Sequence, residues 1–443
     1  MHTPFVHVLV INWNGREHLD ACFRSLLDSP YEHARFVLVD NGSDDGSVAF
    51  VREAFGGDPR VEILALERNL GWSGGNNAGI RRALEAGADY VLLLNNDTWT
   101  DPNALSELVA RMEAEPDLGA LAPKMLLYDQ PELLNSVGIE CSVIGVGWDR
   151  GLGRADGPKW DAPVDVAGVC GGACFLRCSA IDQVGLLPED YGIYLDDLEL
   201  CLRLWNAGFR VQTCPSARVR HKFSATMGKP EHVDRKYYLN TRNRFRLLLR
   251  NYPLRAAGTL LPALVRGEAK AWGRAALDGA WRRIGAHLRA YADALGYLPV
   301  ALRCRAEYRR RGIATCRFWD LVRRDPLFFP GIELPVQGWY RPREREGRAF
   351  HPMAPRAWVE THGRPLRGEI ANWYPELGLV DVTVCGDGVP LTRFCVRDAE
   401  SFALTIPAGT IEFRAQRLFD ADDTGEGVDI GGWFAFDGSP PTE

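Results

Sequence analysis

The chain has 443 residues, enough for about three domains at the usual ~150 residues each, and its 46% apolar content is ordinary for a protein with extensive cores. The composition therefore excludes disorder as the main state. The formal net charge of −6 argues against a nucleic-acid-binding protein that works through overall charge.

The charge is unevenly divided along the chain. Residues 236–330 hold 20 Lys and Arg against 6 Asp and Glu, a balance of +14, so the remainder carries −20. This division indicates that one part of the protein meets an anionic surface. The 11 cysteines lack the spacing of a disulfide framework or a zinc site, and residues 1–8 lack the features of a secretory signal. We therefore expect reduced thiols and a cytoplasmic location.

Short apolar runs alternate with segments of helical periodicity over residues 1–95. We expect strands at residues 6–11, 36–39, 61–66 and 90–94, and helices at 17–27, 47–55 and 76–86. This alternation predicts parallel βαβ units whose sheet is covered on both faces. Because ligands of open α/β sheets bind beyond the carboxyl ends of the strands, the polar residues that follow these strands are expected to form one pocket.

Three further kinds of sequence follow. Residues 122–166 are irregular, after which we expect a buried strand at 171–176, helices from 179 and at 195–206, and two short strands at 210–213 and 217–221. Residues 237–324 have helical periodicity and are rich in Arg and aromatic residues. Short apolar segments at 380–384, 395–396, 402–406, 411–413 and 433–436 indicate a β-sandwich. The predicted domains are therefore 1–235, 236–330 and 331–443.

The first expected strand is followed by Asn12-Trp13-Asn14-Gly15. A dinucleotide-binding domain would have G-x-G-x-x-G here, and a P-loop would have G-x-x-x-x-G-K-[ST]. Dehydrogenases and P-loop kinases are therefore disfavoured. A sugar-phosphate nucleotidyltransferase would need a Gly-rich basic signature at the same place, so this alternative is weak as well.

Polar motifs after the next three strands indicate a nucleotide site. Asp40 can accept a hydrogen bond from the imide N–H of uracil or thymine, although a plain turn and helix cap is the alternative. Arg68 begins a Gly-rich turn whose backbone N–H groups suit a diphosphate or a ribose, with a plain strand-to-helix turn as the alternative. Asp97 offers a hard oxygen ligand for Mg²⁺ or Mn²⁺, or else caps a helix.

The order of these motifs resembles that of the family 2 glycosyltransferases of the GT-A fold, in the bacterial branch that includes rhamnosyltransferases. The resemblance covers roughly residues 5–250. Its further elements are Gly171-Gly172-Ala173-Cys174-Phe175-Leu176, Leu195-Asp196-Asp197-Leu198-Glu199, Gly208-Phe209-Arg210-Val211 and Ala217-Arg218-Val219-Arg220-His221. It implies an α/β fold with a GT-A nucleotide-diphospho-sugar transferase domain, followed by the basic helical segment and the C-terminal β-sandwich.

The resemblance also implies roles for single residues. Asp40 matches the base-recognising aspartate, and Asn95-Asn96-Asp97 takes the place of the D-x-D metal motif, with Asn95 replacing the first Asp. Asp97 and His221 are the implied ligands of Mn²⁺ or Mg²⁺, although a histidine at a strand end is often only structural. The residues implied in donor binding are Asn12, Asp40, Arg68, Asn69, Gly71, Asn77 and Asn95.

Asp197 matches the catalytic aspartate of the family. Inversion at an anomeric carbon requires a base on the acceptor side to remove the proton of the attacking hydroxyl. Asp196 precedes it where relatives have Glu, and an adjacent carboxylate raises the pKa of the base. The alternative is that both carboxylates only favour a helix N-terminus. The aromatic and Gly positions before this pair differ from the family pattern, which bears on acceptor contacts.

The resemblance implies an inverting, metal-dependent glycosyltransferase of cell-surface polysaccharide synthesis. The donor is a dTDP or UDP sugar, with rhamnose expected first and a hexose or galactofuranose next. The acceptor is a glycan, free or linked to a polyprenyl diphosphate at the inner face of the plasma membrane. The basic segment is compatible with a peripheral contact at that membrane, or with a solvated helical hairpin packed on the catalytic domain. A non-catalytic carbohydrate-binding protein is the remaining alternative, and the sequence predicts no oligomeric state.

Overall fold

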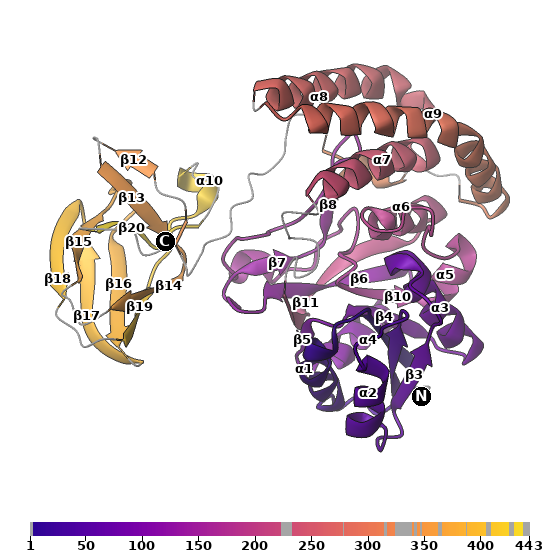
Figure 1. Ribbon diagram of the computed structural model, residues 1–443, viewed down its shortest axis with the longest axis horizontal. Coiled ribbons are helices and arrows are strands. Elements are labelled where there is room, and N and C mark those ends of the chain that lie inside the picture. The colour runs from indigo at the N-terminus through magenta and orange to yellow at the C-terminus, as the bar shows by residue number, and fades with distance from the viewer. Residues whose placement is uncertain are drawn as a thin grey trace. The chain divides into compact units, whose positions relative to one another are not determined.

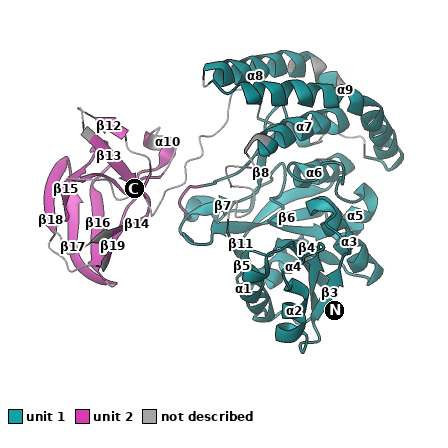
Figure 2. Cartoon of the chain, in the orientation of Figure 1, with its two compact units in different colours: residues 1–152, 157–328 teal, residues 153–156, 329–443 magenta. Residues whose placement is uncertain are grey.

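The computed structural model describes residues 3–222, 233–277, 279–313, 317–323, 339–340, 343–345, 348–361, 366–386, 388–404, 409–424 and 429–436. It divides into two compact units (Figure 2). Unit 1 contains residues 1–152 and 157–328, and unit 2 contains residues 153–156 and 329–443. The predicted boundary between residues 330 and 331 lies outside the described residues, as do the last two residues of the strand expected at 402–406.

Unit 1 is built on a mixed sheet in the order β3-β2-β1-β4-β10-β6-β11-β5, with β7 paired to β6 (Figure 1). Its first four strands are parallel, as predicted. They are β1 (Val6–Asn12), β2 (Ala34–Asp40), β3 (Val61–Ala65) and β4 (Tyr90–Asn95), joined by α1 (Arg16–Leu27), α2 (Ser47–Phe55) and α3 (Gly71–Glu85). Leu9 packs into one core and Val8 into another, which explains why β1 is apolar without alternation.

The second half of this sheet departs from the expected pattern. The strand expected at 171–176 is β10 (Ala173–Arg177), which runs antiparallel to both of its neighbours. The two closing strands are one strand, β11 (Arg210–His221), interrupted by a register shift between Cys214 and Arg218. The remaining elements of this region are β5 (Thr98–Thr100), α4 (Ala104–Ala114), β6 (Leu118–Leu127), β7 (Leu134–Ser136), β8 (Ile139–Cys141), β9 (Gly147–Asp149), α5 (Cys178–Val184) and α6 (Asp196–Ala207).

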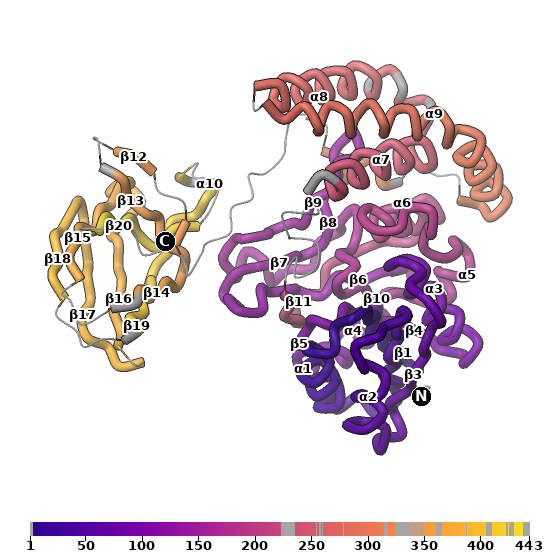
Figure 3. The backbone as a smooth tube through the Cα atoms, in the orientation of Figure 1, coloured from indigo at the N-terminus to yellow at the C-terminus, as the bar shows by residue number. Residues whose placement is uncertain are grey.

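The basic segment forms three helices that belong to unit 1. They are α7 (Val233–Asn251), α8 (Ala257–Leu277) and α9 (Trp281–Arg310). The backbone tube shows α7 between α6 and the pair formed by α8 and α9 (Figure 3). Among the helices that the structure describes, none is both long and apolar enough to cross a membrane.

Unit 2 is a β-sandwich, as predicted. One sheet has the order β12-β13-β20-β15-β18 and the other β14-β19-β16-β17, and both supply side chains to one core. The strands are β12 (Arg343–Arg345), β13 (Arg348–Met353), β14 (Arg356–Thr361), β15 (Leu366–Ala371), β16 (Val380–Gly386), β17 (Val389–Val396), β18 (Ala399–Leu404), β19 (Gly409–Ala415) and β20 (Gly432–Phe436), with the short helix α10 (Ala421–Thr424). Trp433 and Phe434 are fully buried in this core.

Candidate active site

The turn after β4 connects the polar strand ends of unit 1. Asn95 accepts a hydrogen bond from Trp72 Nε1 at 3.2 Å, and its Nδ2 lies 3.3 Å from His221 Nε2. The next residue, Asn96, donates through Nδ2 to Asn12 Oδ1 at 2.6 Å. This turn therefore joins the end of β1 to the end of β11.

Asp40 is buried at the end of β2, opposite Asn12 in the register of the two strands. Its Oδ1 accepts hydrogen bonds from Asn12 Nδ2 at 2.9 Å and from Ser43 Oγ at 2.7 Å, and its Oδ2 accepts one from Ser43 N at 3.0 Å. A carboxylate offers about four acceptor positions. Asp40 is thus held in place by three donors and keeps acceptor capacity for a fourth.

The Gly-rich turn places its predicted residues in different surroundings. Arg68 and Asn69 are exposed, and Asn69 Oδ1 accepts hydrogen bonds from Gly71 N and from Asn41. Gly71 has φ +77°, the left-handed region that favours glycine. Asn77 is buried, and its amide bonds to Leu187 and to the side chain of Glu189. The described contacts of Asn69 and Asn77 are thus made within the protein.

Asp97 and His221 face each other across the edge of the sheet. Asp97 Oδ1 lies 3.3 Å from His221 Nε2, and Asn135 Oδ1 lies 2.6 Å from His221 Nδ1. Since Asn135 Oδ1 can only accept, Nδ1 carries the proton and the Nε2 lone pair is directed at the carboxylate. Two electron-pair donors that face each other fit a cation between them. The described residues contain no group of three or more His, Cys, Asp or Glu side chains able to hold a metal by themselves.

Asp196 and Asp197 begin α6. Asp196 is buried and accepts a hydrogen bond from Ser73 Oγ. Asp197 accepts hydrogen bonds from Gly171 N at 2.8 Å and from Leu198 N at 2.7 Å. Burial raises the pKa of both carboxyls, and the charge of Asp196 raises the pKa of Asp197 further.

A glycine lets the backbone approach Asp197 closely. A Cβ atom at Gly171 would lie 2.7 Å from the Trp72 ring and 3.3 Å from Asp197 Oδ2. The next residue, Gly172, accepts a hydrogen bond from Asn95 N at 3.0 Å through its carbonyl oxygen. One dipeptide therefore links Asp197 to the turn that carries Asp97.

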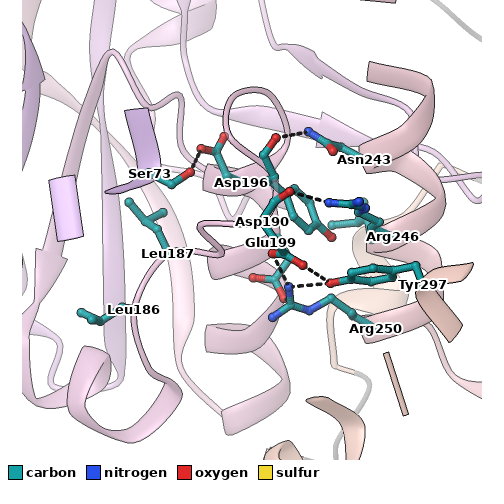
Figure 4. Close-up of polar contacts among 12 residues, drawn as sticks. Ser73, Leu186, Leu187, Asp190, Asp196, Glu199, Asn243, Arg246, Arg250 and Tyr297 are labelled. Atoms are coloured by element: carbon teal, nitrogen blue, oxygen red, sulfur yellow. Dashed lines mark hydrogen bonds and ion pairs between the residues drawn. The ribbon is translucent and has the colours of Figure 1, made fainter. Parts of the chain in front are cut away.

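The backbone before Asp196 is strained, and a side chain of helix α7 holds it in place. Tyr194 and Leu195 have φ of 74° and 61°, in the left-handed region that non-glycine residues rarely adopt. Asn243 of α7, which is fully buried, donates through Nδ2 to the carbonyl oxygens of Tyr191, Ile193 and Tyr194 at 3.2, 2.9 and 2.9 Å. Figure 4 shows Asn243 reaching this turn from its helix.

Other basic side chains of α7 hold the same turn. Arg242 donates to Tyr191 O at 2.7 Å, and Arg246 donates to Asp190 O. Arg250 lies 3.3 Å from Asp190 Oδ1 and 3.3 Å from Glu199 Oε1, in the cluster that also contains Tyr297 (Figure 4). Several arginines of the basic segment thus bind inside unit 1.

The structure thereby brings Asn12, Asp40, Asn95, Asp97, His221 and Asp197 into one hydrogen-bonded system. Sequence reasoning missed the residues that position them. These are Trp72, Ser73, Asn96, Asn135, Asp149 and Asn243. Asp149 ends β9, burial raises the pKa of its carboxyl, and its charge in turn raises the pKa of Asp197. Trp72 lies in the Gly-rich turn that begins at Arg68, and Asn96 lies in the Asn95-Asn96-Asp97 turn. Their places in these predicted motifs could have identified them as residues of the site.

Comparison with known proteins supports the fold and the class of enzyme. A solved structure, "Crystal structure of GalNAc-T7 with UDP, GalNAc and Mn2+", matches with a TM-score of 0.52 at 14% identity, over 82% of this chain and 63% of that one. An N-acetylglucosaminyl-diphospho-decaprenol L-rhamnosyltransferase of Mycobacterium tuberculosis (strain H37Rv) is 27% identical over 51% of this chain and 79% of its own. The galactofuranosyltransferase GlfT1 of Mycolicibacterium smegmatis is 27% identical over 52% and 74%.

The fold and its site define a glycosyltransferase of the GT-A fold. Residues 7–184 match the model of the family described as "Glycosyl transferase family 2". This domain is similar to that family, and the curated relatives named above include a rhamnosyltransferase.

Proposed function

We propose that this glycosyltransferase moves a sugar, rhamnose-like or a hexose, from a nucleotide diphosphate donor to a hydroxyl of a glycan. The transfer inverts the anomeric centre and depends on Mn²⁺ or Mg²⁺. The system that joins Asp40, Asp97 and Asp197 through the Asn95-Asn96-Asp97 turn is the observation that carries this proposal.

Asp40 is proposed to select the base of the donor. Its fixed carboxylate keeps acceptor capacity, and the imide N–H of uracil and of thymine supplies a donor. A UDP or dTDP sugar is therefore the proposed donor. Arg68 is exposed beside this site and supplies a cation for its diphosphate.

Asp97 and His221 are the residues that would hold the metal ion, because their donor atoms face each other at 3.3 Å. A bound Mn²⁺ or Mg²⁺ would neutralise the charge of the leaving diphosphate. Since no third protein ligand is grouped with them among the described residues, the oxygens of the donor are proposed to complete the coordination.

Asp197 is the proposed general base. Its Oδ2 is fixed by Gly171 N and its raised pKa suits proton removal near neutral pH better than that of an ordinary carboxylate. It takes the proton of the acceptor hydroxyl as the oxygen attacks the anomeric carbon. Asp196, bound to Ser73, positions and tunes this base.

The acceptor is proposed to be a glycan or a polyprenyl-diphosphate-linked glycan in cell-surface polysaccharide synthesis. The names of the mycobacterial relatives, a decaprenol-linked rhamnosyltransferase and a galactofuranosyltransferase, support this class. We propose a cytoplasmic location for this reaction. The division into functional parts 1–235, 236–330 and 331–443 stays a prediction.

The test combines donor hydrolysis with nucleotide binding in the full chain. Wild type is screened against UDP and dTDP sugars, and calorimetry measures UDP and dTDP binding with and without Mn²⁺. We expect Asp197→Asn to keep donor binding and lose about 10²- to 10⁴-fold in transfer, because a general base contributes this much. Asp97→Ala is expected to abolish the effect of Mn²⁺ on binding.

Two exposed or peripheral carboxylates serve as controls: Asp182→Asn on α5 and Asp101→Ala after β5. Both should behave as wild type. Near-normal turnover of Asp197→Asn would contradict the assignment of the base, and Mn²⁺-independent binding in wild type would contradict the metal site. Release of pyrophosphate from a nucleoside triphosphate would instead indicate a nucleotidyltransferase.

A further inference from the structure

The helix α9 carries a row of exposed apolar side chains. Trp281, Leu288, Leu295 and Leu302 follow one another at intervals of seven residues, and Leu295 is 77% exposed. Residues seven apart lie on nearly the same face of an α-helix. Large apolar residues that recur on one exposed face mark an interaction surface.

The neighbouring helix α8 also exposes apolar side chains. Leu261 and Val265 are exposed one turn apart, and Leu277, at the end of the helix, is 87% exposed. Trp281 begins α9 just beyond it, so the end of the hairpin carries two large apolar side chains. An exposed Trp beside Leu is typical of the boundary between water and a bilayer.

On these two helices, exposed cations outnumber exposed carboxylates. Arg266, Lys270 and Arg303 are exposed. By contrast, the carboxylate of Glu268 contacts Arg244 and His287, and that of Asp293 accepts a hydrogen bond from Tyr238. Glu268 and Asp293 are thus turned toward α7, whereas Glu307 pairs with Arg310 and Arg311 at the end of α9.

We infer that the exposed faces of α8 and α9 form a docking surface for an anionic phospholipid bilayer, with the leucines in the acyl boundary and the Lys and Arg side chains at the headgroups. Complementary charge favours a bilayer as the occupant, because a second copy of the chain would bring like charges together. Arg242, Arg246 and Arg250 of α7 bind within unit 1 and are not part of this surface. The inference does not rest on the proposed transfer reaction.

Cosedimentation of the full chain with vesicles tests this surface. Wild type is expected to bind phosphatidylglycerol-containing vesicles and to bind pure phosphatidylcholine vesicles more weakly. The double variant Leu295→Glu with Leu302→Glu should bind anionic vesicles at least about tenfold more weakly, since buried apolar area and positive charge drive interfacial binding. Both side chains are exposed, so the fold of unit 1 should not change.

The matched control places the same charges on unit 2. Val389 is 62% exposed on β17, and Leu391 is exposed on the same strand. Val389→Glu with Leu391→Glu should bind vesicles as wild type does. Donor hydrolysis should be equal in all three proteins, because none of these residues lies in the catalytic site.

A second double variant measures the contribution of positive charge to vesicle binding separately from that of the apolar side chains. Arg266→Glu with Arg303→Glu should weaken binding to anionic vesicles and leave the weak binding to neutral vesicles unchanged. Absence of vesicle binding by wild type, or equal loss in the control, would overturn the inference. So would a dimer, measured by light scattering without lipid, that Leu295→Glu with Leu302→Glu dissociates, because the row would then be covered by a second copy.

Discussion

The two amides of the Asn95-Asn96-Asp97 turn make contacts that carboxylates cannot make. Asn95 accepts from Trp72 and donates toward His221 Nε2, while Asn96 donates to Asn12. An ionised carboxylate only accepts hydrogen bonds. Asn at these positions therefore lets the turn contact His221 and donate to Asn12 without adding negative charge beside Asp97. The single carboxylate of the turn is a consequence of this network.

The tautomer of His221 is expected to depend on Asn135. In Asn135→Ala the ring loses its acceptor at Nδ1, so Nε2 is no longer held as the unprotonated nitrogen facing Asp97. Loss of such an orienting partner typically costs about 10- to 100-fold in metal affinity. Titration of Mn²⁺, followed by electron paramagnetic resonance in the presence of UDP, measures this change. Asn206→Ala, at a buried amide on α6, is the control that should leave the Mn²⁺ affinity unchanged.

The pH dependence of transfer is expected to follow the raised pKa of Asp197. A base must be deprotonated to act, so the rate falls as the pH drops through its pKa. Burial and the charge of Asp196 place that fall above the value of about 4 for an ordinary carboxyl. In Asp196→Asn the neighbouring charge is absent, and the acid limb should move to lower pH. A kcat profile of both proteins between pH 4 and 8 measures the shift, and an unmoved limb would contradict the coupling.

The sequence predicted the chemical groups of the site better than their supports. Asp40 and Asp97 could be placed together because each follows a strand of one parallel sheet. Asn135 and Asn243 could not, because they contact His221 and Tyr194 across 86 and 49 residues. Nothing in their local sequence distinguishes an amide that orients a ligand from one on the surface.

At the scale of elements, α7 acts as a support for the first turn of α6. The strained turn at Tyr194 and Leu195 leads directly into Asp196 and Asp197, and Asn243 donates to the carbonyl groups of Tyr191, Ile193 and Tyr194. A strained backbone conformation is retained where the surrounding contacts fix it firmly. The helix that follows the catalytic sheet is thus part of the device that positions the proposed base.

Removal of this support should affect catalysis more than donor binding. Asn243→Ala is expected to lower the free energy of unfolding by about 1–3 kcal/mol, the cost of buried polar groups left without partners. It should also lower kcat while the KM for the donor stays unchanged, because the described hydrogen bonds of Asp40 go to Asn12 and Ser43 and not to α7. Urea unfolding and steady-state kinetics measure both effects.

Asn240→Ala is the matched control on the same helix, since the Asn240 amide bonds only to Lys236 O within α7 in the described structure. It should leave kcat unchanged. Equal kinetics of Asn243→Ala and wild type would contradict the role of α7 in positioning the base.

Periodicity predicted the elements of the first half of the sheet, and in the second half it indicated β10 and β11 but not β6. The parallel strands are continuous runs of Val and Leu, whereas β6 contains Gly119, Ala120, Pro123 and the buried Lys124. Lys124 is neutralised by Asp161, a partner far along the chain. The local sequence of β6 therefore does not indicate a strand, because the contacts that stabilise it form only in the folded chain. The sequence of β11 indicates two strands because the apolar alternation stops at its register shift.

At the scale of the whole molecule, one segment of four residues lies between the two sequence ranges of unit 1 but belongs to unit 2. Residues 153–156 belong to unit 2, where Arg154 contacts Asp420 and Asp429 at 2.9 and 3.0 Å and Ala155 N donates to Asp429 Oδ2 at 2.8 Å. These bonds tie a short segment to the sandwich through partly buried charges. No boundary drawn at one position in the sequence could have separated the two units.

The contacts of Arg154 are expected to stabilise unit 2 selectively. Arg154→Ala should reduce the protection of the β20 amides against hydrogen exchange by about 1–3 kcal/mol, because Asp429 is buried. The amides of β1 should be unaffected. Arg393→Ala, which removes an exposed ion pair with Asp381, is the control and should change protection by less than about 1 kcal/mol. Equal losses in both units would contradict the assignment of this segment.

The same segment has a consequence for synthesis. Arg154 and Asp429 are 275 residues apart, so at about 5–20 residues per second a ribosome takes tens of seconds to make the second after the first. Residues 3–152 are made before this interval, and helices α7, α8 and α9 are made during it. The contacts of Arg154 with Asp420 and Asp429 can therefore form only after most of unit 2 has been synthesised.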